Sequence, residues 1–171
     1  MHRERITMIR KGLISLALGL AVSSAANAEW VTNAQDDIFS GGQKAMLIGA
    51  IDPYHTLVFD CDSNGLFMSL LEKGKWEKGM ELASYRLLVK VDRGEVYDFA
   101  ARGSQRNDLY TQASVSDKTE ILKLLGEIRD AQQQVQIGMQ IKEFGAEWSG
   151  TASVAGSTRE ANRFLNACKL Q

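Results

Sequence analysis

Few residue types in this 171-residue chain could do chemistry, and they are widely spaced. His55 is the single histidine after the N-terminal segment, and it follows Pro53 in a predicted turn. A hydrolase needs a nucleophile, a base and a group that orients the base. Ser157 follows a glycine, but its neighbours do not form a Gly-x-Ser-x-Gly elbow. We therefore expect His55 to be a surface turn residue and Ser157 to start a helix.

Paired carboxylates occur twice, as Asp36 with Asp37 and as Asp60 with Asp62. Such pairs could bind calcium or act as general acid and base. Calcium requires about six or more oxygen ligands, usually from a loop of fixed spacing, and no such loop is visible. No glycine-rich phosphate loop follows a predicted strand either. We expect these carboxylates to be solvated charges at strand edges, and we expect no enzyme, no catalytic residue, no cofactor and no metal site.

The N-terminus has the pattern of a secretory signal peptide. Basic residues lie between positions 3 and 11, residues 13–22 are apolar, and 26–28 read Ala-Asn-Ala. The apolar run is too short to span a bilayer. We predict a signal peptide at 1–28 and a single domain at 29–171, located in the periplasm or secreted.

The predicted domain contains two cysteines, Cys61 and Cys168. Two thiols in an exported protein most often form a disulfide. The alternatives are two free thiols or a metal site, and a metal site would need further ligands. We predict a Cys61–Cys168 disulfide, which would close a long loop of the unfolded chain.

The sequence around each cysteine is consistent with a buried position. In 56–62, Leu57, Phe59 and Cys61 alternate onto one face of a strand. In the last segment the apolar residues follow a helical spacing, at Ala161, Phe164, Leu165 and Cys168. Ser157 with Glu160 three residues later has the spacing of a capping box. The disulfide would then tether a C-terminal helix to a strand.

The rest of the chain alternates between strand and helix patterns. Asn64-Gly65 and 92–95 each separate two apolar runs, which predicts two hairpins. Six to eight strands are expected among 44–52, 56–62, 66–71, 83–91, 96–101, 109–115, 135–141 and 147–154. One further helix is expected at 116–132, capped by Ser116 or Asp117. We predict an α+β fold: a curved antiparallel sheet, or a small sandwich or partial barrel, with two helices.

Charge excludes two classes of partner. The whole chain has 20 Lys/Arg and 21 Asp/Glu, of which four and one lie in residues 1–28. Residues 29–171 therefore hold 16 basic and 20 acidic residues, a formal net charge of −4. The charges are mixed along the chain, so we expect no nucleic-acid partner and no stable membrane insertion after signal cleavage.

One polar segment, 72–79, places Trp76 among Lys73, Lys75 and Lys78. An exposed tryptophan surrounded by lysines could contact a protein or an anionic glycan. Alternatively, Trp76 folds back and covers the sheet edge. Both interpretations stay open at this point.

The arrangement resembles a known group of exported proteins. Trp30 is followed by Asp36-Asp37, then by the strand–cysteine–turn–strand unit 57–71, and finally by a glycine turn and a cysteine-bearing helix at 155–168. In these features the chain resembles the VasI/TagO group associated with type VI secretion. It is also similar in outline to the invasion-associated locus B family. The resemblance implies an accessory or interaction role in the bacterial envelope, with no catalytic residues to transfer.

We therefore expect an exported, non-catalytic domain that binds an envelope or extracellular protein. The alternative is a periplasmic domain that binds a small ligand or a glycan on a concave sheet face.

Overall fold

The computed structural model describes residues 29–38 and 41–170. The predicted signal peptide at 1–28 lies outside this part of the chain. The strands are β1 (Trp30–Asp37), β2 (Gly42–Ala50), β3 (His55–Asp62), β4 (Gly65–Lys73), β5 (Tyr85–Val91), β6 (Val96–Asn107), β7 (Tyr110–Val115), β8 (Gln134–Ile141) and β9 (Ala146–Ser153). The helices are α1 (Lys118–Asp130) and α2 (Ser157–Ala167), and two 3₁₀ turns are η1 (Met80–Leu82) and η2 (Lys142–Phe144).

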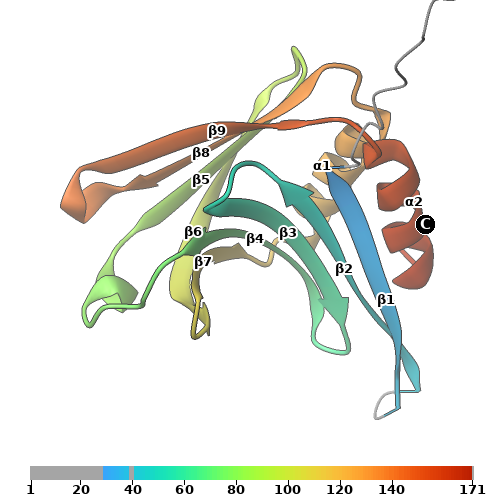
Figure 1. The fold of residues 1–171 in the computed structure, drawn as a ribbon, viewed down its shortest axis with the longest axis horizontal. Helices are drawn as coiled ribbons and strands as arrows, with labels where there is room; N and C mark the ends of the chain where they lie inside the picture. The colour runs from blue at the N-terminus through green and yellow to red at the C-terminus, as the bar shows by residue number, and fades with distance from the viewer. Residues whose placement is uncertain (1–28, 39–40, 171) are drawn as a thin grey trace, which may run out of the picture.

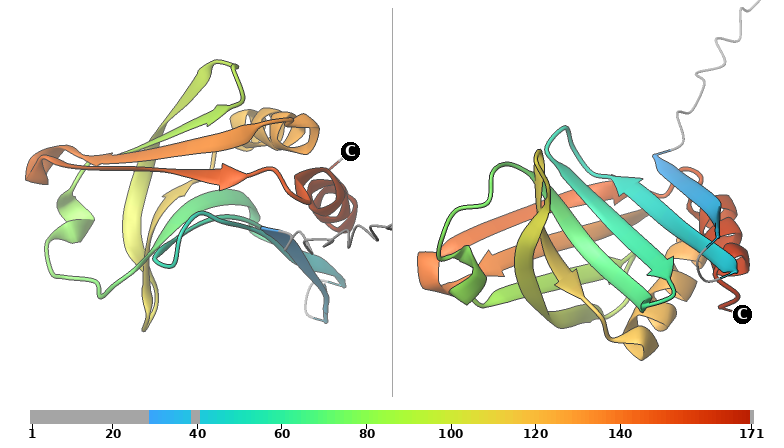
Figure 2. Two further views of the ribbon diagram at one scale, coloured as in Figure 1. Left: turned by 45° about the horizontal axis from the view of Figure 1, so that its top comes forward. Right: turned by 90° about the horizontal axis from the view of Figure 1, so that it is seen from below.

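The nine strands form one antiparallel sheet in the order β1-β2-β3-β4-β7-β6-β5-β8-β9. The sheet is open and strongly curved, so that β5, β8 and β9 diverge from β1 to β4, as Figures 1 and 2 show. Strands β6 and β7 connect these two parts. The predicted α+β class and the curved antiparallel sheet are confirmed.

Both helices lie on the same side of the molecule (Figure 1). Helix α1 packs against α2, β4 and β5, while α2 packs against β1 and β2. Each helix buries one apolar stripe, which α1 forms from Ile121, Leu124, Leu125 and Ile128 and α2 from Ala161, Phe164 and Leu165. These side chains join the inward residues of the strands in one hydrophobic core. In the described residues, no helix is long and apolar enough to cross a membrane.

The disulfide between Cys61 and Cys168 is present, with Cα atoms 6.1 Å apart and a sequence separation of 107. Cys61 is buried at the end of β3, and Cys168 lies at the C-cap of α2. The C-terminal helix is thus covalently tethered to a strand, as expected. Such a bond fits an oxidising compartment outside the cytoplasm.

Two hairpins were predicted correctly. Strands β3 and β4 pair from Asp62 opposite Gly65, and β5 pairs with β6 from Lys90 opposite Val96. Asp117 is the N-cap of α1, and its carboxylate accepts the backbone N–H groups of Thr119 and Glu120. In each case the signal was local turn or cap chemistry.

The capping box at Ser157 is wrong. The N-cap of α2 is Gly156 at φ 86°, and no side chain caps this helix. The Glu160 carboxylate instead accepts the backbone N–H of Thr32 in β1 at 2.9 Å, and the Thr32 hydroxyl donates to the Glu160 carbonyl at 2.7 Å. Glu160 therefore connects α2 to the sheet and does not close its own helix.

Strand β1 was not predicted, because only part of its sequence alternates clearly. It buries Trp30 and Thr32 but is otherwise mostly polar. The indole of Trp30 is fully buried over Gly49, and its Nε1 donates to the Ser153 carbonyl at 2.7 Å. Trp30 therefore holds the start of β1 against the end of β9.

Candidate functional site

The first half of β6 is an interior part of the sheet with strand pairing on one side only. Strand β6 has 12 residues and β7 has six, so β7 pairs with β6 only from Arg102 onwards. After Val115 the chain leaves the sheet and enters α1 through the cap residue Asp117. Residues 96–101 therefore pair with β5 alone. In the described part of the chain, no strand pairs with their other edge.

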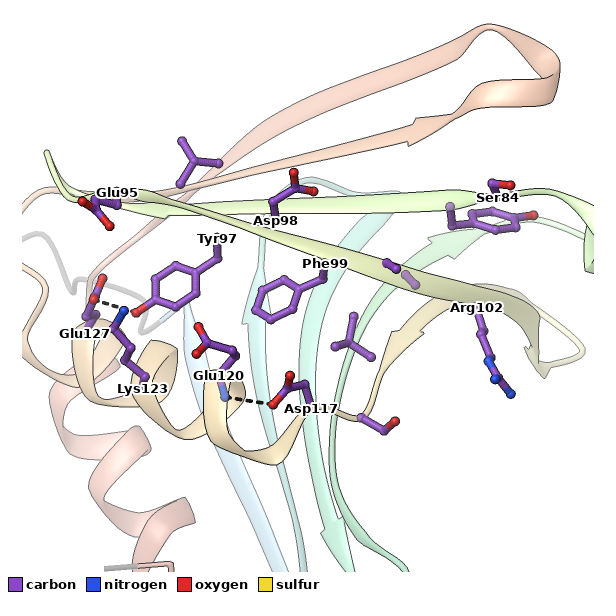
Figure 3. A pocket seen from close by; sticks show the side chains of 16 residues that line it. Ser84, Glu95, Tyr97, Asp98, Phe99, Arg102, Asp117, Glu120, Lys123 and Glu127 are labelled. Atoms are coloured by element: carbon purple, nitrogen blue, oxygen red, sulfur yellow. Dashed lines mark hydrogen bonds between the residues drawn. The ribbon is translucent and has the colours of Figure 1, made fainter.

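A groove of about 1000 Å³ runs along this free edge, between β6 and α1 (Figure 3). The strand side contributes every residue from Glu95 to Arg102, and the helix side contributes Asp117, Glu120, Lys123 and Glu127. Tyr97 and Phe99 point from β6 towards the helix and stack with ring centroids 5.9 Å apart. We call this feature the β6–α1 groove.

The base of the groove is held by Tyr97. Its hydroxyl donates to the Glu127 carboxylate at 2.6 Å, and the Lys123 ammonium lies 5.2 Å from the centre of its ring. Burial, together with the hydrogen bond to Glu127 and nearby negative charge, raises the pKa of Tyr97. Tyr97 thus stays a neutral hydrogen-bond donor that fixes the distance between strand and helix.

The rim of the groove is acidic. The lining holds five carboxylates, from Glu95, Asp98, Asp117, Glu120 and Glu127, against two cations, from Arg102 and Lys123. The excess is three negative charges, in a groove flanked by unpaired backbone groups. Chemically, such a site suits a hydrogen-bonding strand with basic side chains better than it suits an anion.

A second surface contains the sequence-predicted contact residues. Four loops lie together where β5 begins and β6 ends, namely those that follow β2, β4, β6 and β8. We call this surface the loop end. Its apolar members are exposed to 60% at Tyr54, 82% at Leu82, 63% at Leu109 and 61% at Phe144. Backbone hydrogen bonds connect these loops, from Lys73 to Tyr54, Gly74 to Leu109 and Lys142 to Ser84.

Trp76 is half-buried within the loop end. It lines a cavity of only about 10 Å³ together with Leu70, Met80 and Tyr85. The tryptophan thus folds back over the sheet, whereas Lys73, Lys75 and Lys78 are exposed. The second interpretation expected Trp76 to cover the sheet edge, whereas the strand residues beside it belong to interior strands of the sheet.

The expectation that His55 is a surface turn residue is wrong. His55 is the first residue of β3 and is only 9% exposed. Its ring stacks on Trp148 of β9 with centroids 3.9 Å apart, and Nδ1 lies 2.9 Å from the Asp52 carboxylate. Burial raises the pKa of Asp52, but hydrogen bonds from the Tyr54 and His55 backbone and from the His55 ring outweigh it, and the net shift is downwards.

The Asp52–His55 pair has the carboxylate–imidazole contact that also occurs in catalytic triads. The Glu72 carboxylate lies 3.8 Å from His55 Nε2. In the residues that the structure describes, no hydroxyl or thiol forms a hydrogen bond with Nε2, and no group of three or more metal-binding side chains is found. The stacking on Trp148 indicates a structural contact between β3 and β9.

The expectation of solvated strand-edge charges is wrong for Asp60. Its carboxylate accepts two hydrogen bonds from Arg106, at 2.8 and 2.9 Å, and its side chain is 21% exposed. Asp62 is exposed and accepts the N–H of Asn64 in the hairpin turn. Asp36 accepts a hydrogen bond from Gln43 at 3.3 Å, at the far end of the β1–β2 pair.

Asp60 and Arg106 lie in a hollow on the polar face of the sheet. The hollow measures about 400 Å³, and its lining includes Ser69, Ser104, Gln112 and Ser114. The Ser69 and Ser114 hydroxyls are 2.7 Å apart, and the Gln112 amide donates to Ser104 at 3.0 Å. Most polar groups in this hollow are therefore already satisfied by one another.

Sequence reasoning found neither the groove nor the hollow. The groove depends on the unequal lengths of β6 and β7. To find it, sequence analysis would have had to extend the strand predicted at 96–101 to residue 107. The run 102–107 is polar and contains Gly103, so its pattern did not predict a strand. The hollow depends on contacts between strands that are distant in sequence.

Comparison with known proteins indicates the fold and not the function. No family model matches the chain, and no curated protein matches it. The crystal structure of invasion associated protein B from Bartonella henselae is similar, with a TM-score of 0.51 and 12% sequence identity over 83% of this chain and 95% of that chain. This similarity agrees with the expected outline of the invasion-associated locus B family. No comparison supports the VasI/TagO assignment, and at 12% identity the similarity shows that the two chains share a fold.

Proposed function

We propose that this protein is an exported, non-catalytic domain that binds a partner protein of the cell envelope or the extracellular space, and that the partner docks in the β6–α1 groove. One observation carries this proposal. One edge of β6 at 96–101 is unpaired and lines a groove of about 1000 Å³. Unpaired edges are normally protected, because their free N–H and C=O groups pair readily with other chains. An edge left open inside a groove fits a docking role.

The disulfide supports the export part of the proposal, because oxidising compartments favour such bonds. A link to type VI secretion rests only on the sequence resemblance to the VasI/TagO group. It remains a proposal that the identity of the partner would test.

Site-specific photo-crosslinking tests the docking surface. A photoreactive residue would replace Val96 in the groove, Lys75 at the loop end, or Thr151 on β9 as a control, since all three side chains are exposed. We expect one defined crosslinked partner in cells that export the protein, obtained from position 96 and not from 151. Crosslinking from position 75 alone would move the docking surface to Trp76 and its lysines. If position 151 gave a crosslink and position 96 gave none, docking in the β6–α1 groove would be refuted.

A second candidate is binding of a small ligand or glycan in the polar hollow. The observation that favours it is Arg102, which lines the hollow, is exposed, and in the described residues has no ion pair. Calorimetric titration with neutral and acidic sugars, compared between the native chain and an Arg102→Ala variant, would detect such binding. Heats identical to buffer with both proteins would remove this candidate.

A further inference from the structure

We infer that the occupant of the β6–α1 groove is an extended polypeptide segment that adds to β6 as an extra strand and carries lysine or arginine side chains. This inference rests on the proposed function and specifies the class of partner. It follows from two independent properties of the groove, the free backbone of its strand wall and the excess negative charge of its lining.

Residues 96–101 have one backbone edge that no strand of the described chain pairs with. Their inner hydrogen-bonding edge is used by β5. On the outer edge every second residue directs its N–H and C=O into the groove, because these groups alternate along a strand. Six residues span about 20 Å at about 3.3 Å each, the length of an ordinary strand. A strand placed there would continue the sheet in the position that β7 occupies beside 102–107.

Three of the five carboxylates that line the groove bind other groups of this chain. Asp98 is paired with Arg86 at 2.6 Å, Asp117 caps α1, and Glu127 accepts the Tyr97 hydroxyl. In the described residues, the side chains of Glu95 and Glu120 form no hydrogen bond or ion pair. They line the groove immediately before β6 and on the first turn of α1. An occupant with basic side chains would neutralise both.

The same charges argue against a second copy of this chain as the occupant. Two grooves facing each other would bring together two sets of excess carboxylates, which repel. Apolar contact is also limited, because Tyr97 and Phe99 are only 7% and 6% exposed. Backbone pairing and ion pairs must therefore provide most of the affinity, and a flexible segment can supply both.

The test uses the purified, disulfide-bonded chain and a phage library of random peptides of about 12 residues, a length that covers the six-residue edge with flanks on both sides. We expect selected peptides to be enriched in lysine and arginine. Charge reversal by Glu95→Lys or Glu120→Lys should lower the affinity for a synthetic peptide about fivefold, because each variant removes one ion pair at the rim of the groove. Glu77→Lys, the same charge change in the exposed loop 74–79, should leave affinity unchanged.

A second measurement examines the backbone directly and needs no substitution in the protein. Hydrogen exchange followed by NMR should show peptide-induced protection of alternate amides within 96–101. Methylating alternate amide nitrogens of the peptide should abolish binding in one register and preserve it in the other. Protection confined to α1 or to the loop end, or equal loss with both methylation patterns, would overturn strand addition.

The outcomes separate this inference from the proposed function. A crosslink from position 96 to a partner, combined with no peptide binding, would leave the docking groove standing and overturn the extended basic occupant. The basic character of the occupant would be overturned if the selected peptides were not enriched in lysine and arginine and if Glu120→Lys left their affinity unchanged. Concentration-dependent dimers that protect 96–101 without any peptide would identify a second copy as the occupant and refute the inference.

Discussion

Arg106 of β6 binds Asp60 of β3 through two hydrogen bonds of 2.8 and 2.9 Å, although β4 and β7 lie between their strands. A flat sheet would not allow this contact, because two intervening strands separate the backbones by about 14 Å. The polar face must therefore be hollow at this point. The pair stabilises the curvature that separates the two parts of the sheet.

Removal of Arg106 should destabilise the protein more than removal of an exposed arginine. Arg106→Ala leaves the half-buried Asp60 carboxylate without its partner and should cost about 1–3 kcal/mol in the free energy of unfolding. Arg86→Ala breaks the Arg86–Asp98 pair, whose side chains are 52% and 48% exposed, and should cost clearly less, because solvent screens an exposed ion pair. Urea denaturation of both variants measures the difference. Equal losses would show that the Asp60–Arg106 pair has no special role.

Reduction of the disulfide should lower the thermal midpoint. The bond restricts a loop of 107 residues in the unfolded chain, and its loss typically costs about 2–4 kcal/mol. Thermal unfolding with and without reductant tests this, with a Cys61→Ala/Cys168→Ala variant as the control that should be insensitive to reductant. A midpoint that reductant leaves unchanged in the native chain would contradict the tether.

Glu160 should contribute to stability through the backbone of β1. In a Glu160→Ala variant the buried N–H of Thr32 loses its acceptor, which should cost about 1–3 kcal/mol. Arg159→Ala removes only the outer ion pair to Glu160, on a side chain that is 72% exposed, and should cost less than about 1 kcal/mol. Chemical denaturation of the two variants is the measurement. A larger loss for Arg159→Ala would show that the ion pair, and not Thr32, is the important contact.

Two glycines should respond to alanine in opposite directions. A Cβ at Gly103 would lie 2.3 Å from the Tyr85 ring, so Gly103→Ala should destabilise by about 1–3 kcal/mol. A Cβ at Gly126 within α1 meets nothing within 4 Å, so Gly126→Ala should stabilise by about 0.5–1 kcal/mol. Differential scanning calorimetry should show midpoints moving apart. A shift in the same direction for both variants would contradict the close approach of Tyr85 to β6.

Asp92 should make stability depend on acid pH. Hydrogen bonds from the backbone N–H groups of Gln132, Gln134 and Gln133 lower its pKa in the folded state, although burial opposes this. A lowered folded pKa stabilises the protein above the ordinary carboxyl pKa of about 3.9, and the stabilisation is lost as the pH falls through the folded value. The midpoint difference between the native chain and Asp92→Asn should therefore be larger at pH 6 than at pH 3. A difference that grows towards low pH would reverse the sign and refute this role.

Sequence alone determined the features whose signals are local. Alternation around Cys61 and the helical stripe ending at Cys168 identified a buried strand and a buried helix face, and the disulfide between them is confirmed. Asp117 was recognised as one of two possible caps because capping involves residues only two or three positions away. The turns at 63–65 and 92–95 were found for the same reason.

Tertiary structure decided everything that depends on strand order and strand length. It stacked His55 on Trp148 and paired Asp60 with Arg106. It also made the Glu160 carboxylate an acceptor for the Thr32 N–H, where the sequence had predicted a cap of its own helix. It also left one edge of 96–101 unpaired, because β7 ends at Val115 and α1 begins beside β6. Local patterns specify which face of an element is apolar, but they do not specify which distant element packs against that face. The groove on which the proposed function rests exists only through that long-range choice.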